Sequence, residues 1–150
     1  MKTPGQKNLA ARKALFALLL AAIAVAIVYA VLQNRPWIVP EEAKQVKNPL
    51  EPSDAALKSI RPIYVEKCVS CHGNSGKGDG HDASLYHPAP SNFTDAKQMY
   101  GVTDGELFYK MTVGHQPMPS FKKRLSEEQR WQLVLLIRSF TEPPANLDVK

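Results

Sequence analysis

Two cysteines and a histidine stand close together near the middle of the sequence, at Cys68, Cys71 and His72. Two residues separate the cysteines, so both sulfurs lie along one edge of a single helical turn, and the histidine follows directly. This C-x-x-C-H spacing is typical of covalent haem attachment, in which each thiol forms a thioether with a haem vinyl group and the imidazole binds the iron. We therefore expect one covalently bound haem c held by these three residues.

Three other interpretations of the cysteines explain less of the sequence. A structural zinc site usually needs four ligands, and there is no second cysteine pair, while the remaining histidines are scattered at His81, His87 and His115. A thioredoxin-type dithiol would need a βαβ pattern around the motif, which the sequence lacks. An ordinary disulfide fits an oxidising compartment but gives His72 no role.

A haem iron bound by one histidine has a second axial position, and Met118 is the residue that we expect to fill it. Pro117 and Pro119 flank this methionine, and Gly114 lies just upstream. Proline restricts both its own backbone and that of the residue before it, so the segment is expected to be a stiff, helix-free loop. Such a loop can present a thioether from a fixed position.

The other candidates for the sixth ligand have different expected roles. Met111 falls on the same predicted helix as Phe108, which is the pattern of ordinary core packing. Met99 lies in a flexible stretch and is expected to be a surface or gap-filling residue. His115, in the same loop as Met118, is the alternative ligand, and a bis-histidine site would have the lower reduction potential.

The first of three expected helices delivers the chain to Cys68. It occupies some or all of residues 53–71, where Ser53 can cap its start and Pro62 either kinks it or begins its second piece. Residues 73–102 follow and are rich in Gly, Pro, Asn and Asp, which makes an unusually long loop for a compact domain. A large planar cofactor is one object that such a loop can wrap.

The second and third helices begin with capping signals. Thr103 and Glu106 form a capping box that opens the second helix, and Gly114 ends it. Ser126 and Gln129 form another that opens the third helix. The third helix stops before Pro143 and Pro144. Its broad apolar face consists of Trp131, Val134, Leu135, Ile137 and Phe140. We see no convincing strand pattern, so we expect an all-α domain.

The N-terminal segment predicts a membrane anchor. Residues 14–32 are a run of 19 apolar residues without Gly or Pro, which is the length that spans a bilayer. Four basic and no acidic residues lie in residues 1–13, so this tail should stay cytoplasmic. We expect a single-pass protein of the inner (cytoplasmic) membrane with its haem domain on the periplasmic side. The alternative is a cleaved signal peptide, with small residues at 24–26 or 28–30 as its cleavage site.

The rest of the chain is divided by composition. Prolines at four positions in residues 33–52 predict an extended tether, followed by the haem domain over residues 53–142 and a C-terminal tail over residues 143–150. Beyond residue 32 the chain has 15 basic and 14 acidic residues, so the formal charge of +5 comes mainly from the N-terminus. This distribution predicts no nucleic-acid partner.

Taken together, the motifs resemble the small His/Met-ligated cytochromes c, in the form of membrane-anchored, single-haem members. The resemblance covers residues 60–140 and rests on the order of its motifs: C-x-x-C-H-G from Cys68, G-K-G-D-G at 76–80, P-A-P-S-N-F at 88–93, D-G-E-L-F at 104–108, M-P-S-F at 118–121 and the helix at 131–140. It implies that the first and last helices cross near the haem edge. It also implies that the carbonyl of Pro88 or Pro90 accepts a hydrogen bond from His72.

The resemblance further implies an electron carrier and not an enzyme. With His72 and Met118 both bound, the iron would change oxidation state without admitting a small-molecule substrate. The expected partners are redox proteins or subunits of a respiratory complex, which the domain would serve as a tethered shuttle or as a fixed subunit. The alternative is a haem c sensor or a peroxidase-like enzyme with an open sixth position. Basic residues at 122–124 form either a docking patch for an acidic partner or a solvated face.

Overall fold

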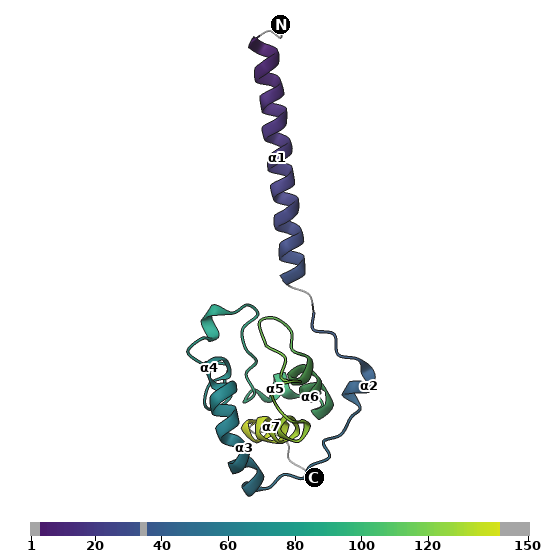
Figure 1. Cartoon of the computed structure of the whole chain (residues 1–150), viewed down its shortest axis with the longest axis vertical. Helices are drawn as coiled ribbons and strands as arrows, with labels where there is room; N and C mark the ends of the chain where they lie inside the picture. Colours follow the sequence, from purple (N-terminus) through teal and green to yellow (C-terminus); the bar gives the residue numbers. More distant parts are fainter. Residues whose placement is uncertain (1–3, 34–35, 142–150) are drawn as a thin grey trace. The chain divides into compact units, whose positions relative to one another are not determined.

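The computed structural model of the protein describes residues 4–33 and 36–141. The chain forms two compact units, Met1–Trp37 and Ile38–Lys150. The first unit contains one long helix, and the second contains all the other helices (Figure 1).

The long helix of the first unit is α1, which runs from Pro4 to Gln33. Its stretch Arg12–Leu32 is long and apolar enough to cross a membrane, and no residue of that stretch is buried within the chain. Over residues 14–32 apolar side chains cover every side of the helix, so this part has no polar face to turn toward water. α1 is therefore a candidate transmembrane helix, at the position where the sequence predicts an anchor.

Three helices form the framework of the second unit. They are α3 (Asp54–Lys67), α6 (Asp104–Val113) and α7 (Glu127–Phe140). α7 packs against both of the others and lies between them in Figure 1. The shorter helices are α2 (Glu41–Lys44), α4 (Val69–His72), η1 (Ala83–Leu85) and α5 (Ala96–Met99). The described part of the chain contains no strand, which confirms the all-α fold.

The capping signals at α6 and α7 act largely as predicted. At the start of α7 the Ser126 hydroxyl accepts from the Gln129 amide at 3.1 Å, and the Gln129 side chain accepts from the Ser126 amide at 2.9 Å. At the start of α6 the Thr103 hydroxyl accepts from the Glu106 amide at 3.1 Å. The Glu106 carboxylate, however, pairs with Lys110 one turn later at 2.6 Å, so the second half of that box is replaced by an ion pair.

α3 also begins at its predicted cap, because the Ser53 hydroxyl accepts from the Ala56 amide at 3.2 Å. The helix continues through Pro62, which therefore does not begin a separate piece. The break comes at Cys68, which ends α3 and caps the start of α4.

The core of the second unit lies where α3, α6 and α7 meet, and loop residues close it. Met111 is 4 % exposed and Met99 is 7 % exposed. Met111 thus has the core role expected of it, and Met99 is a gap-filling residue and not a surface one. The other members come from all three helices and the loops: Ile60, Tyr64, Phe93, Leu107, Phe121, Leu125, Trp131, Leu133, Val134, Leu136 and Ile137.

Residues 38–52 belong to this folded unit, although the prolines in the segment predict a tether. Val39 is buried, and the Asn48 side-chain amide donates to the Trp131 carbonyl at 3.1 Å. Carbonyls of the segment also lie against Gly105 on α6, where any Cβ atom would collide with them. The physical reason is that two apolar residues between the prolines, Val39 and Leu50, pack on the folded unit. Proline content alone does not reveal such packing.

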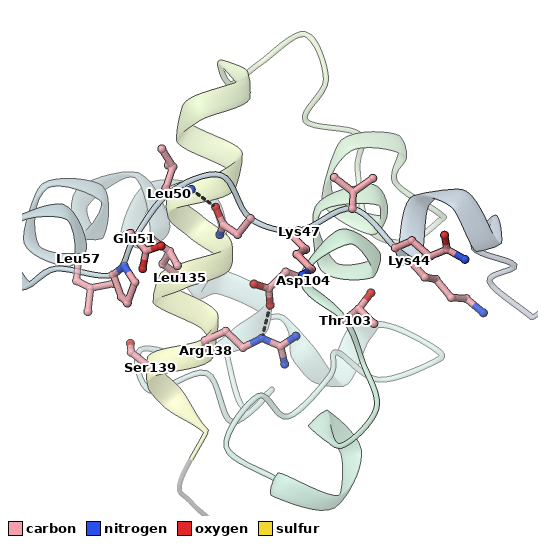
Figure 2. Close-up of a pocket in the computed structure, with 14 residues that line it drawn as sticks. Lys44, Lys47, Leu50, Glu51, Leu57, Thr103, Asp104, Leu135, Arg138 and Ser139 are labelled. Atoms are coloured by element: carbon pink, nitrogen blue, oxygen red, sulfur yellow. Dashed lines mark hydrogen bonds and ion pairs between the residues drawn. The ribbon is translucent and has the colours of Figure 1, made fainter.

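A cavity of about 750 Å³ lies between residues 44–52 and the facing ends of α6 and α7 (Figure 2). In its wall Arg138 and Asp104 point toward each other and form an ion pair at 2.7 Å. Arg138 also donates to the Val102 carbonyl, so this arginine ties the end of α7 to the start of α6.

Candidate functional site

The three predicted attachment residues lie together at α4, with Cys68 at its start and Cys71 and His72 in its single turn. Both cysteines are half-buried and neither is in a disulfide. Burial raises the pKa of the Cys68 thiol to about 12, and the nearby Cys71 thiol adds to the effect. The surroundings therefore favour an uncharged sulfur, which a thioether provides and a zinc-bound thiolate does not.

The loop after the motif holds α4 in place through its backbone. Three amides at alternate positions donate to three consecutive carbonyls of the motif: Gly78 to His72 at 2.9 Å, Gly80 to Cys71 at 3.1 Å and Asp82 to Ser70 at 2.8 Å. The approach is so close that a Cβ atom on Gly80 would collide with the carbonyl oxygens of Val69 and Ser70. The glycine-rich stretch thus satisfies the carbonyls that a helix end leaves unpaired.

A buried tyrosine holds the chain on the other side of His72. The Tyr64 hydroxyl, on α3, donates to the carbonyl of Gly73 at 2.9 Å. The Tyr64 ring lies 5.2 Å from the Phe140 ring, and the Arg61 guanidinium lies 5.4 Å from both ring centroids. The residue after His72 is therefore fixed to the α3 and α7 framework.

The His72 ring is oriented so that one nitrogen is available to a ligand. Its Nδ1 lies 3.3 Å from the Ser91 carbonyl oxygen, and because a carbonyl can only accept, Nδ1 must donate. The neutral ring then has its lone pair on Nε2, as in metal-bound histidines. Burial lowers the pKa of His72, against the opposing effect of the Ser91 carbonyl, so the ring is neutral at pH 7. The Phe93 ring stacks on the His72 ring, with the two ring centroids 4.6 Å apart.

The identity of this carbonyl corrects an expectation. The resemblance implied that Pro88 or Pro90 accepts the bond from His72, but the acceptor is Ser91. The reason lies in the path of the loop, because the Pro90 carbonyl points at Gly78, where a Cβ atom would lie only 2.5 Å from it. The carbonyl next in sequence is the one that faces the imidazole.

Met118 lies in a tightly closed loop. The amide of His115 donates to the Met118 carbonyl at 2.9 Å, and the Met118 amide donates back to the His115 carbonyl at 2.8 Å. Gly114, with φ of 71°, ends α6 and turns the chain into this loop. Met118 is half-buried and packs against the same hydrophobic cluster as Cys68. Its role as the second axial ligand stays a prediction.

Several residues that shape the site were missed by the sequence analysis. Ser91 and Phe93 fall inside the P-A-P-S-N-F motif, but nothing in that motif says which carbonyl faces the histidine. Tyr64 had a usable signal, because it lies four residues before Cys68 and so on the same helical face.

The donor set fits a covalently attached haem. Two free thiols and an imidazole with an available Nε2 lie on one turn, and a thioether lies on a separate closed loop. Among the residues that the structure describes, no three or more His, Cys, Asp or Glu side chains gather as a metal-ion site would require.

Comparison with known proteins agrees with this chemistry. The family model described as "Cytochrome C oxidase, cbb3-type, subunit III" matches residues 55–137. The cytochrome bc1 complex cytochrome c subunit of Corynebacterium diphtheriae is 28% identical over 102 residues, covering 66% of this chain and 32% of that protein. A chain of the reducing HAO-like protein complex of Kuenenia stuttgartiensis is 30% identical, with a TM-score of 0.57, covering 75% of this chain and 54% of that one. The present chain thus spans about a third of the curated relative.

Proposed function

Because the chain belongs to the family of cytochrome c oxidase, cbb3-type, subunit III, and is a c-type cytochrome, we propose that it transfers single electrons through one covalent haem c. Its place would be a respiratory chain, as a carrier and not as an enzyme with a substrate of its own. The curated relative is named as a subunit of a cytochrome bc1 complex. The partners that we propose are therefore redox proteins or the other subunits of a respiratory complex.

The single observation that carries this proposal is the state of His72, a neutral imidazole that donates from Nδ1 beside two free thiols. A haem bound here would supply an iron that alternates between the ferric and ferrous states. Cys68 and Cys71 would hold it by two thioethers and His72 by Nε2. The Ser91 carbonyl would fix the imidazole orientation, and Met118 would be the second axial ligand.

Covalent attachment is tested by denaturation. Haem should stay with the polypeptide after unfolding and acid extraction, because both thiols are consumed as thioethers. Replacing Cys68 or Cys71 by Ala should weaken or abolish maturation. Red colour that leaves with the solvent from the wild-type protein would refute the attachment.

The axial role of Met118 has spectroscopic tests. A thioether stabilises ferrous iron, so Met118→His should lower the reduction potential while both axial positions stay filled. Met118→Ala should let carbon monoxide change the spectrum of the reduced protein, which the wild type should resist. The oxidised wild type should show the weak long-wavelength sulfur-to-iron absorption. If that absorption is absent, or survives Met118→Ala, His115 is the next residue to test, and carbon monoxide binding by the wild type would favour the sensor or peroxidase alternative.

The same proposal places the protein in the inner membrane, with α1 as a single-pass anchor, the basic N-terminus in the cytoplasm and the haem domain on the periplasmic side. Carbonate washing should leave the protein in the membrane pellet. A truncation that starts near residue 33, fused to an exported signal, should be soluble and still red. Recovery from native cells of a chain that begins near residue 33 would show that α1 belongs to a cleaved signal peptide.

A further inference from the structure

A buried arginine lies next to the loop that carries Met118. Arg130, on α7, is only 6 % exposed, and its Nη1 donates to the carbonyls of Lys122 at 3.0 Å and Leu125 at 3.3 Å. Its guanidinium lies 5.1 Å from the centroid of the Phe108 ring. Burying a charged group is costly unless its donors are used, and bonds from a charged donor are the stronger kind. The contacts of Arg130 with this segment are therefore energetically important.

The two carbonyls lie at the downstream end of the Met118 loop. The upstream end is Gly114, which leaves α6 and passes so close to residues 118–120 that a Cβ atom would lie 2.5 Å from the Ser120 amide nitrogen. The downstream end is tied back to α6 by three bonds: Ser120 hydroxyl to Thr112 carbonyl at 2.7 Å, Phe121 amide to Met111 carbonyl at 3.1 Å and Lys122 amide to Thr112 carbonyl at 3.2 Å. Arg130 holds this same end from α7.

We propose that Arg130 is a positioning residue for the axial ligand, in that it clamps the backbone at Lys122 and Leu125 to α7 and so keeps the loop in the conformation that presents Met118. The inference rests on the proposed function, because it presumes that Met118 binds the haem iron. A planar guanidinium suits the task, since the two N–H groups of its Nη1 are held in one plane and can reach two carbonyls that lie three residues apart. A loop held in one conformation loses less entropy when its side chain binds.

The test compares Arg130→Gln with Arg138→Gln in the full haem-bearing chain in detergent. Arg138 is the matched control, because it lies on the same helix, donates to a backbone carbonyl and carries the same charge, but is tied to Val102 and Asp104 and not to the Met118 loop. In Arg130→Gln the fraction of reduced protein that binds carbon monoxide at pH 7 should rise roughly tenfold, or about 1.4 kcal/mol. The long-wavelength absorption of the oxidised form should weaken. Arg138→Gln should match the wild type in both measurements.

A general stabilising role would give a different result. If Arg130→Gln only lowers the melting temperature, and resists carbon monoxide as the wild type does, the proposal is wrong. Should Arg130→Gln fail to fold, Arg130→Lys decides, because lysine keeps the positive charge but lacks the rigid planar donors that reach both carbonyls. Arg130→Lys should raise carbon monoxide binding in the same direction by a smaller factor, and no rise would overturn the proposal.

The wild-type spectrum distinguishes failure of the proposed function from failure of the Arg130 clamp. A wild type that lacks covalent haem, or lacks the long-wavelength absorption, refutes the proposed function or the Met118 ligation and the clamp with it. A wild type that shows both, together with an Arg130→Gln protein that behaves like Arg138→Gln, refutes the clamp alone.

Discussion

Replacing Tyr64 by Phe removes a single oxygen atom from the interior of the haem domain. The side chain is 1 % exposed, and its hydroxyl donates to the Gly73 carbonyl at 2.9 Å, directly after His72. Phenylalanine keeps the ring and its contact with Phe140. The substitution therefore isolates one buried hydrogen bond that fixes the chain at the end of the haem-attachment motif.

The expected magnitude follows from what remains around the Gly73 carbonyl. The Gly76 amide also donates to it, at 3.3 Å, so Tyr64→Phe does not leave the oxygen without a partner. A buried group left unpaired costs about 1–3 kcal/mol, whereas the net value of one neutral bond is about 0.5–1.5 kcal/mol. We expect the free energy of unfolding to fall by about 1 kcal/mol. For a domain of about 100 residues that corresponds to a melting temperature lower by about 4–8 °C.

Thermal unfolding of the full chain, followed by far-UV circular dichroism in detergent, measures this shift at pH 7. Tyr100→Phe is the control, because Tyr100 is 89 % exposed and its loss should leave the melting temperature unchanged. A melting temperature of Tyr64→Phe equal to that of the wild type would refute the assignment of this bond as a determinant of the site.

The same pair of proteins gives a pH prediction. Burial, with a smaller effect from Cys68, raises the pKa of the Tyr64 hydroxyl above its usual value. Above pH of about 10 the unfolded chain therefore loses the Tyr64 proton while the folded chain keeps it. The stability that this hydroxyl contributes is thus present below that pH and is lost as the pH rises above it. The difference in melting temperature between wild type and Tyr64→Phe should narrow above pH of about 10. A difference that stays constant would contradict the burial argument.

Three further predictions test other parts of the domain. Met111→Ala should lower the free energy of unfolding by about 2–5 kcal/mol, the range for a buried methionine, while the reduced protein still resists carbon monoxide. Gly80→Ala should sharply reduce the yield of haem-bearing protein on purification, because its methyl group collides with the Ser70 carbonyl. Asn48→Ala should cost about 1 kcal/mol in chemical unfolding, since it removes the bond to the Trp131 carbonyl, and no cost would mean that this bond does not stabilise the fold.

The helix starts could be predicted because capping is local. A serine hydroxyl bonds an amide three residues away, so Ser53 and Ser126 carry their information within a single turn. The attachment residues were equally accessible, because the spacing of Cys68, Cys71 and His72 is itself the signal. At Glu106 only half of the predicted capping box forms, because Lys110 one turn later pairs with the carboxylate.

The contacts that could not be predicted join distant segments through backbone atoms. The Ser91 carbonyl faces His72, and the Trp131 carbonyl accepts from Asn48, but a carbonyl carries no side-chain signal in the sequence. The packing of residues 38–52 was missed for a related reason, because proline content describes the conformation of a segment and not the surface beside it. Arg130 is a charged residue in an apolar helical face, and only the structure shows which carbonyls it reaches.

The long loop after the motif is held by hydrogen bonds of its own backbone. The sequence shows some thirty residues without a regular element, for which wrapping a planar group is one explanation. In the structure, amides of residues 78–82 satisfy three consecutive carbonyls at α4, and the Phe93 amide donates to the Gly76 carbonyl at 2.7 Å. These bonds fix the path of the loop. They also bring Ser91 and Phe93 to His72, so the stretch that looks irregular in sequence is the one that sets the tautomer and orientation of the proposed iron ligand.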